Sequence, residues 1–139
     1  MAKEYTLLAS AARVTTAGTN GAAVWIGGFW ERAEIMLDVT ASAHEAGDTL
    51  SVYIDVSPDG SKWLNAARFN TQAGDGAAKT EFVILCPADP GTSTILATSD
   101  CVAGASRPAA HGKYMRARWV IVNSGDADSS HTFSVKAYA

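Results

Sequence analysis

The sequence predicts an all-β fold: an antiparallel β-sandwich, jelly-roll-like, with about eight strands. Two observations carry this prediction. Apolar and polar residues alternate with a period of two in several segments, as in strands that bury one face. Clusters of Gly, Asn, Asp and Ser separate these segments at short intervals, as turns do in sandwiches and barrels. No segment sustains the spacing of three and four residues that marks an amphipathic helix.

The regular alternation defines the strands expected to supply the core. It is strongest in residues 31–41, 49–57, 113–123 and 131–138, and weaker in 5–10, 22–26, 63–69 and 80–85. In the segment 49–57, Leu50, Val52, Ile54 and Val56 are predicted to point inward. Tyr53 and Asp55 would then lie on a solvated outer face, as is usual in antiparallel sheets.

The sharpest turn signal is the run Ser57-Pro58-Asp59-Gly60. Pro58 presets the backbone of the second turn position, and Gly60 accepts the left-handed conformation. The run predicts a tight hairpin that leads into a strand starting near Lys62. Trp63 is expected to tuck over this hairpin, as a core residue rather than as a platform for a ligand.

Length and charge restrict the classes of function. The chain has 139 residues, which predicts one domain spanning 1–139. Charged residues make up 18% and the net charge is -3, so no basic stripe is present to bind nucleic acid. Apolar stretches are short and interrupted, so no membrane span is expected. The first residues lack the pattern of a signal peptide, which predicts folding in the cytosol.

Residues that could carry chemistry do not form a known catalytic or metal-binding pattern. His44, His111 and His131 are expected at strand ends or in loops, with solvated side chains. The run from Asp55 to Gly60 mimics the opening of a calcium loop, but the twelfth position is Ala66 instead of a bidentate Glu. We therefore expect no enzyme activity, no cofactor and no metal.

Two cysteines and three carboxylates leave alternatives open. Cys86 and Cys101 could form a disulfide that closes a short loop, but free thiols are favoured in a reducing cytosol. Glu34, Asp38 and Asp55 fall on outward faces. A carboxylate pair would serve hydrolysis only inside a cleft that shifts one pKa.

The irregular segments are the best candidates for contact with other proteins. Residues 87–112 form a long loop rich in small residues, within which 94–97 could add a short strand. Such loops are functional or have no role beyond connection. Residues 1–16 could act as an N-terminal arm over a neighbouring subunit. The candidate contact residues are Tyr5, Leu7, Trp30, Arg107, Pro108 and His111.

Aromatic and arginine side chains each allow two interpretations. The cluster Trp25, Phe29 and Trp30 could close the core at a corner of the sandwich, or form an exposed anchor, since interfaces are rich in aromatic residues. Arg116 and Arg118 share the polar face of one predicted strand. They could meet a carboxylate on a neighbouring strand or an acidic surface of another subunit.

The sequence also resembles a family. The run from Val52 to Trp63, with its Ser-x-Asp-Gly-x-x-Trp turn, and the later strand with Tyr114-x-Arg116 resemble small virion structural proteins of tailed phages. These are capsid decoration (cement) proteins and neck or tail accessory proteins built on β-sandwiches. The same turn resembles discoidin-like carbohydrate-binding jelly rolls. Together these matches cover residues 49–69 and 113–122.

The phage resemblance implies a particular function. The chain would be a capsid decoration protein that binds and stabilises the phage head lattice. It would be made in the host cytoplasm, incorporated into the virion, and associated as a homo-oligomer, with a trimer favoured. A carbohydrate-binding module, or a neck, tail or fibre accessory protein, is the alternative. The absence of a signal-peptide pattern and the low charge favour the phage interpretation over a secreted lectin.

Overall fold

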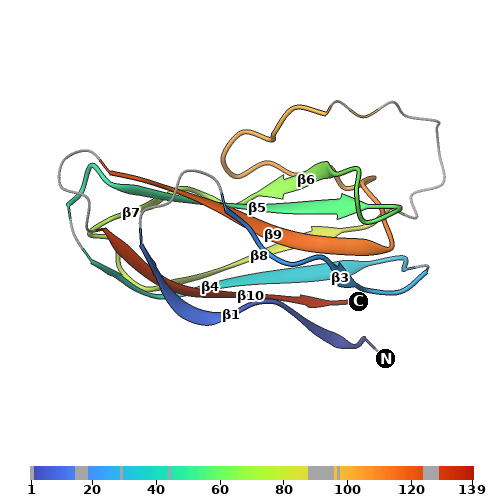
Figure 1. The fold of residues 1–139 in the computed structure, drawn as a ribbon, viewed down its shortest axis with the longest axis horizontal. Helices are drawn as coiled ribbons and strands as arrows, with labels where there is room; N and C mark the ends of the chain where they lie inside the picture. The colour runs from blue at the N-terminus through green and yellow to red at the C-terminus, as the bar shows by residue number, and fades with distance from the viewer. Residues whose placement is uncertain are drawn as a thin grey trace.

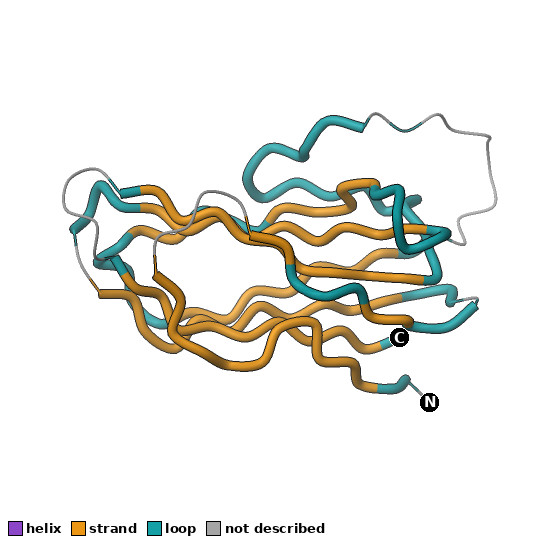
Figure 2. The backbone as a smooth tube through the Cα atoms, viewed as in Figure 1, coloured by secondary structure: helices purple, strands orange, loops and turns teal. Residues whose placement is uncertain are grey.

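The computed structural model describes residues 2–14, 19–28, 30–43, 45–87, 96, 98–123 and 129–139. Within these residues the regular secondary structure consists of strands, which form two antiparallel sheets packed face to face (Figure 1). Figure 2 shows the same two layers, with turns and loops at the ends of the strands. The predicted all-β sandwich is confirmed. The jelly-roll connectivity stays a prediction.

The first sheet, sheet A, has four strands. In spatial order they are β1 (Glu4–Val14), β10 (Ser130–Tyr138), β4 (Ala33–Ala43) and β8 (Lys79–Leu85). The second, sheet B, follows the order β2 (Thr19–Asn20), β9 (Tyr114–Val122), β5 (Thr49–Ser57) and β6 (Leu64–Arg68). Two further short strands pair with it, β3 (Val24–Trp25) with β9 and β7 (Gln72–Ala73) with β5.

The strands follow the alternation of the sequence closely. Each strongly alternating segment is a strand, and β5 has the predicted bounds. The weaker segment 22–26 shrinks to the two residues of β3. The equally short β2 and β7 were not predicted, because two residues carry no period.

The core lies between the inner faces of the two sheets. Phe133, Ile35 and Ile54 are fully buried there, as the alternation predicts. The ring of Trp119 meets the edge of the Phe133 ring, with centroids 6.1 Å apart. Each such side chain removes apolar area from water and contributes roughly 1.5–3 kcal/mol.

The outer face of β5 corrects one expectation. Tyr53 and Asp55 were expected to be solvated, but their exposures are 8% and 2%. The strand lies between β9 and β6, whose long side chains cover it. Alternation reports which face a residue occupies, and it does not report what covers that face.

The N-terminal segment is a strand of the domain rather than an arm. β1 pairs with β10 from Glu4 opposite Tyr138 to Val14 opposite Ser130, with irregularities in between. Leu7 is buried in the core. The Arg13 guanidinium donates to the carbonyl of Phe133 at 2.7 Å and lies 4.5 Å from the centre of its ring.

The predicted turn after β5 is confirmed in its chemistry and is longer than expected. The hydroxyl of Ser57 accepts from the Gly60 amide at 2.8 Å, and Gly60 has a φ of 79°. Oδ1 of Asp59 accepts from the amides of Ser61 and Lys62, both at 2.9 Å. These hydrogen bonds lower the pKa of Asp59. They also hold both residues in the turn, so β6 begins only at Leu64.

His131 is buried, which contradicts the expected solvated position. Its side chain lies on the inward-facing side of β10, as that of Phe133 does. Its Nδ1 lies 2.8 Å from the Ser42 hydroxyl. Nε2 has no hydrogen-bond partner among the described residues. Burial lowers the pKa of His131, and the charge of Asp48 offsets only part of this shift. His44 lies outside the described residues.

The lowered pKa of His131 predicts loss of stability in mild acid. The unfolded side chain binds a proton near its ordinary pKa of about 6.5, whereas the folded one resists it. Stability is therefore complete above about pH 6.5 and falls as pH decreases toward the folded pKa, by at most roughly 1.4 kcal/mol per pH unit. Denaturant unfolding of wild type and His131→Gln across this range checks it. An equal acid slope in the variant would assign the effect to His111, whose pKa burial also lowers.

Gly112 provides a second test of the packing. Its carbonyl accepts from Nε1 of Trp30 at 2.8 Å, and a Cβ at this position would lie 2.5 Å from the Ser57 carbonyl oxygen. We predict that Gly112→Ala lowers the free energy of unfolding by about 1–3 kcal/mol, because the backbone must move to admit the methyl group. Gly28→Ala is the control, since a Cβ at this position would meet no described atom within 4 Å outside its chain neighbours. Thermal unfolding of both variants makes the comparison.

Candidate functional site

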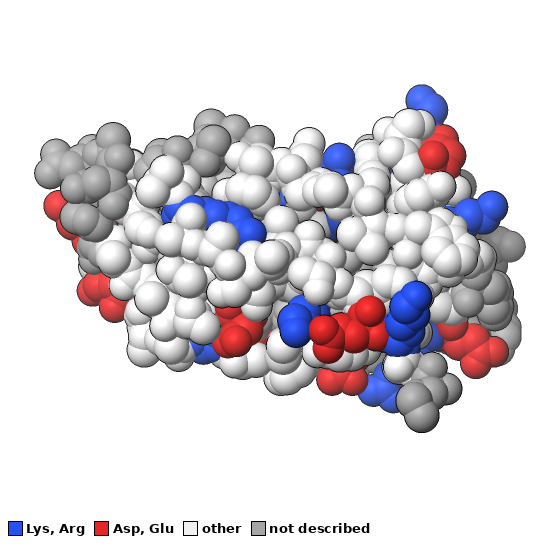
Figure 3. Space-filling model, turned by 60° about the horizontal axis from the view of Figure 1, so that its bottom comes forward, with Lys and Arg blue, Asp and Glu red and all other residues white. Residues whose placement is uncertain are grey.

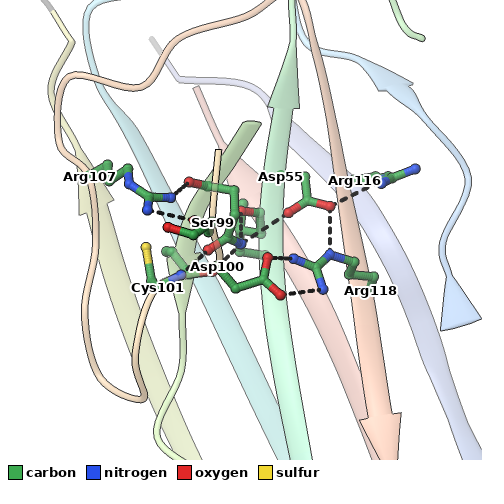
Figure 4. Close-up of polar contacts among 10 residues, drawn as sticks. Asp55, Ser99, Asp100, Cys101, Arg107, Arg116 and Arg118 are labelled. Carbon is green, nitrogen blue, oxygen red and sulfur yellow. Dashed lines mark hydrogen bonds and ion pairs between the residues drawn. The ribbon is translucent and has the colours of Figure 1, made fainter. Parts of the chain in front are cut away.

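A cluster of polar side chains lies on the outer face of sheet B and is centred on Asp55 of β5 (Figure 4). Oδ2 of Asp55 accepts from Nε of Arg116 at 3.1 Å and from Nε of Arg118 at 2.8 Å. On the other side, Nδ2 of Asn65 donates to Oδ1 at 3.0 Å. We call Asp55, Arg116, Arg118 and Asn65, together with Asp100, the Asp55 cluster.

Strand pairing explains why these side chains meet. Arg116 on β9 and Asn65 on β6 each stand opposite Asp55 in the ladder. Side chains in directly opposed positions lie about 4.5–5.5 Å apart at Cβ, so a carboxylate and a guanidinium come into contact. The interpretation in which the two arginines meet a carboxylate on a neighbouring strand is confirmed.

Arg118 extends the cluster to the loop before β9. Its guanidinium lies between two carboxylates, because it also hydrogen-bonds Asp100 through Nη2 to Oδ1 and through Nη1 to Oδ2 at 3.3 Å (Figure 4). Burial by itself would lower the pKa of Arg118, but the hydrogen bonds and charges of Asp55 and Asp100 outweigh it and raise the pKa. The side chain therefore acts as a permanent cation that joins the loop to the sheet.

Further hydrogen bonds fasten residues 98–107 along the free edge of β6. The Cys101 amide donates to Oδ1 of Asn65 at 2.8 Å, and Nη1 of Arg107 donates to the Asn65 carbonyl at 2.6 Å. Backbone bonds join Arg68 to Ala105 and Gly104, and Ser106 forms a bridge with Ala67. In Figure 1 this segment lies above β6.

This part of the predicted loop 87–112 is therefore bonded to the sheet rather than loose. Its described residues are irregular apart from the bridge at Ser106. The predicted strand at 94–97 falls outside the described residues, except for Leu96.

Aromatic rings flank the two arginines. The Arg116 guanidinium lies 4.2 Å from the centre of the Trp63 ring, and that of Arg118 lies 4.1 Å from the centre of the Tyr53 ring. Trp63 is half-buried on the outer face of sheet B, so the prediction that it belongs to the core is wrong. Its ring is in contact with a guanidinium rather than open as a platform.

The six candidate contact residues are not brought together. Leu7 and Trp30 are buried in the core, which corrects their expected role as exposed contacts. Tyr5 is half-buried on β1, and the His111 ring packs on Trp30 with centroids 4.8 Å apart. Arg107 donates to the carbonyls of Asn65 and Ser99. Pro108 alone of the six is exposed.

Trp25 and Trp30, the described aromatic residues near Gly27, lie in different environments, one as each interpretation predicts. Trp30 lies in the core, whereas Trp25 is 57% exposed. Phe29 lies outside the described residues.

A second set of exposed apolar side chains was not predicted, with Phe82 and Ile84 on β8 and Val102 in the loop. The alternation of residues 80–85 carries the signal, because an inward Val83 leaves Phe82 and Ile84 outward.

The face of sheet A that turns away from sheet B carries charges of both signs, including Glu34, Asp38 and Lys136, among neutral side chains. Figure 3 shows Lys, Arg, Asp and Glu in several places on the visible face, most densely at the lower right, with neutral areas between them. At the margin of sheet A, Nζ of Lys136 pairs with Oε1 of Glu4 at 3.0 Å. Hydrogen bonding and charge from Lys136 lower the pKa of Glu4.

The two cysteines do not form a disulfide in the structure. Cys86 is exposed, Cys101 is buried and both are free, so the thiol interpretation is confirmed. Burial raises the pKa of Cys101 and favours the protonated thiol.

Among the described residues, His, Cys, Asp and Glu form no group of three that could hold a metal ion. No helix in the described part of the chain is long and apolar enough to span a membrane.

Comparison of the chain with protein-family models, with curated proteins and with solved structures finds no match.

The Asp55 cluster predicts a large cost for removing its central charge. In Asp55→Ala, two partly buried guanidinium groups lose their shared carboxylate, and the free energy of unfolding should fall by about 3–5 kcal/mol. Asp100→Ala is the matched control, because its half-exposed carboxylate contributes less than about 1 kcal/mol. Urea unfolding measures both. Equal, small effects in the two variants would show that the cluster contributes little to stability.

Proposed function

We propose that the chain is a structural protein of a tailed-phage virion, and specifically a capsid decoration protein that binds and stabilises the head lattice. The observation that carries the proposal is the fastening of residues 98–107 to sheet B by Arg107, Arg118 and backbone hydrogen bonds. A segment that is already ordered loses little conformational entropy when a partner binds, so its contact area contributes more fully to affinity.

The chemistry of the segment suits broad contact with protein. Val102 is 73% exposed and Pro108 is also exposed, beside a run of small residues. The low share of charged residues, 18% of the chain, means that few ionic groups need to be desolvated in an interface. A lattice that offers many equivalent sites would further strengthen such contacts when the protein is oligomeric.

The resemblance of the turn and the Tyr-x-Arg strand to phage proteins supports a capsid as the partner. The order of residues 98–107 supports this segment as the contact surface. In this proposal the protein acts mechanically. It bridges adjacent capsid subunits, adds buried area to their contact and so raises the free energy needed to separate them. Association as a homo-oligomer belongs to the same proposal.

A carbohydrate-binding module is the second candidate, and one observation favours it. Trp25 is 57% exposed and could stack on a sugar ring. Two other tryptophans argue against it, since Trp30 is buried and Arg116 lies against Trp63. Glycan-array binding that is lost in Trp25→Ala would favour this candidate.

Binding to capsids tests the decoration role. We predict that the purified protein co-sediments with empty capsids of the phage that encodes it and raises the temperature at which they break. Val102→Asp should weaken binding, because it places a charge at the centre of the proposed contact. Thr40→Asp on β4 is a control of equal charge outside that surface. Absence of co-sedimentation at micromolar concentration, with correctly folded protein, would overturn the proposal.

A further inference from the structure

The edge of sheet A at β8 differs from the other sheet edges of the described structure. β1 is interrupted by register irregularities, and residues 104–107 cover β6. The opposite edge of sheet B consists of the short strands β2 and β3. β8 pairs with β4 in unbroken register over Lys79–Leu85 and has no strand on its other side. Irregularities and covers of this kind protect edges from association, and among the described residues β8 has neither.

Space is present beside this edge. A groove of about 270 Å³ separates residues 81–84 of β8 from Gly104–Ser106, the segment that covers β6. The described residues that cover β6 therefore do not extend over β8. Backbone N–H and C=O groups that point away from β4 can be reached by another strand.

The outer face of β8 carries exposed apolar side chains. Phe82 is 58% exposed and Ile84 is 44% exposed, while Val83 between them packs against the core. An edge strand that combines an open backbone with exposed apolar side chains is a site of strand addition.

The sequence around β8 is complementary to itself. When two copies of Gly76-Ala-Ala-Lys-Thr-Glu-Phe-Val-Ile84 run antiparallel with Thr80 opposite Thr80, Lys79 of each faces Glu81 of the other. In the same register Phe82 faces Ala78, and Ile84 faces Gly76. Each large side chain therefore meets a small one, and each charge meets its opposite.

Lys79 and Glu81, the two charged residues of this register, already form an ion pair within one chain. Nζ of Lys79 lies 2.5 Å from Oε1 of Glu81 in the same chain, and Asn70 hydrogen-bonds both residues. Their side chains are 23% and 20% exposed. Two copies in the twofold register would bring together two positive and two negative charges in alternation, which is favourable across a strand pair.

We propose that β8 pairs with β8 of a second copy of this chain, antiparallel about a twofold axis at Thr80. The two copies of sheet A then form one continuous sheet, and the contact is isologous, with the same surface contributed by both. The occupant of the edge is a second copy because both charge and side-chain size complement themselves in one register.

The proposal is independent of the capsid. A twofold contact predicts a dimer in solution, whereas the trimer implied by the phage resemblance requires a different, head-to-tail contact. Dimerisation is measured with the purified chain alone. Its failure would leave the decoration role standing, and failure of capsid binding would leave the dimer standing.

Site-directed disulfide formation tests the register. In a Cys86→Ser background, which removes the exposed native thiol, Thr80→Cys should form a dimer under a mild oxidant, because opposed residues of a strand pair lie within disulfide reach. Ala78→Cys in the same background should not, since the two copies of residue 78 would be roughly 13 Å apart along the strands. Equal crosslinking of both variants, or none of Thr80→Cys, would overturn the proposal.

Exchange of charges gives a second test. Lys79→Glu alone and Glu81→Lys alone should each weaken self-association by roughly tenfold in sedimentation experiments, because like charges then face each other. An equimolar mixture of the two variants should associate as well as wild type. The intrachain pair is broken in both variants, so recovery in the mixture can come only from contact between copies. A mixture as weak as its components would overturn the proposed register.

Discussion

The burial of one carboxylate organises sheet B. Asp55 stands in the middle strand of the sheet with almost no solvent contact, and a charge in that position is tolerated only when it is paired and hydrogen-bonded. Arg116 and Arg118 supply the positive charge from β9, and Asn65 supplies a neutral donor from β6. The partners of Asp55 come from the strands on both sides of β5, so the need to pair this charge also restricts the register of the three strands.

The need to pair the charge of Asp55 also affects the loop that precedes β9. Two guanidinium groups around one carboxylate leave an excess positive charge, and Asp100 balances it from the preceding loop. Asn65 uses its amide group in both directions, donating to Asp55 and accepting from the Cys101 amide. The order of residues 98–107 thus depends on the charge inside the sheet, and so does the surface that we propose for capsid binding.

Sequence patterns predicted the strands well because alternation is a local property of the chain. They predicted the environment of the outer faces poorly. Tyr53 and Asp55 were placed on the correct face, but their cover comes from side chains of neighbouring strands. Around Asp55 these are Asn65, 10 positions away along the chain, and Arg118, 63 positions away, and no local pattern reports which strands are neighbours. His131 was misplaced for a different reason. It shares the inward face of its strand with Phe133, but it begins the alternating segment 131–138, so its position at a strand end predicted a solvated side chain.

The Asp55 cluster was half visible in the sequence. The shared face of Arg116 and Arg118 indicated a carboxylate partner, but the identity of that partner depends on which strands are neighbours. Turn chemistry was more predictive, since Ser57, Asp59 and Gly60 form their hydrogen bonds within a few residues of one another. The free edge at β8 could not be inferred, because an edge is defined by the topology of the whole sheet.

The position of β10 between β1 and β4 has a consequence for synthesis on the ribosome. Among the described strands β1 pairs only with β10, so its residues must wait for Ser130–Tyr138 to emerge before they can pair. Contacts that join residues so far apart in sequence close slowly, because the intervening chain loses much of its freedom at that step. Until then β4 exposes the edge that β10 will occupy. The nascent chain therefore passes through a stage in which half of sheet A is open, and this is when aggregation competes most strongly with folding.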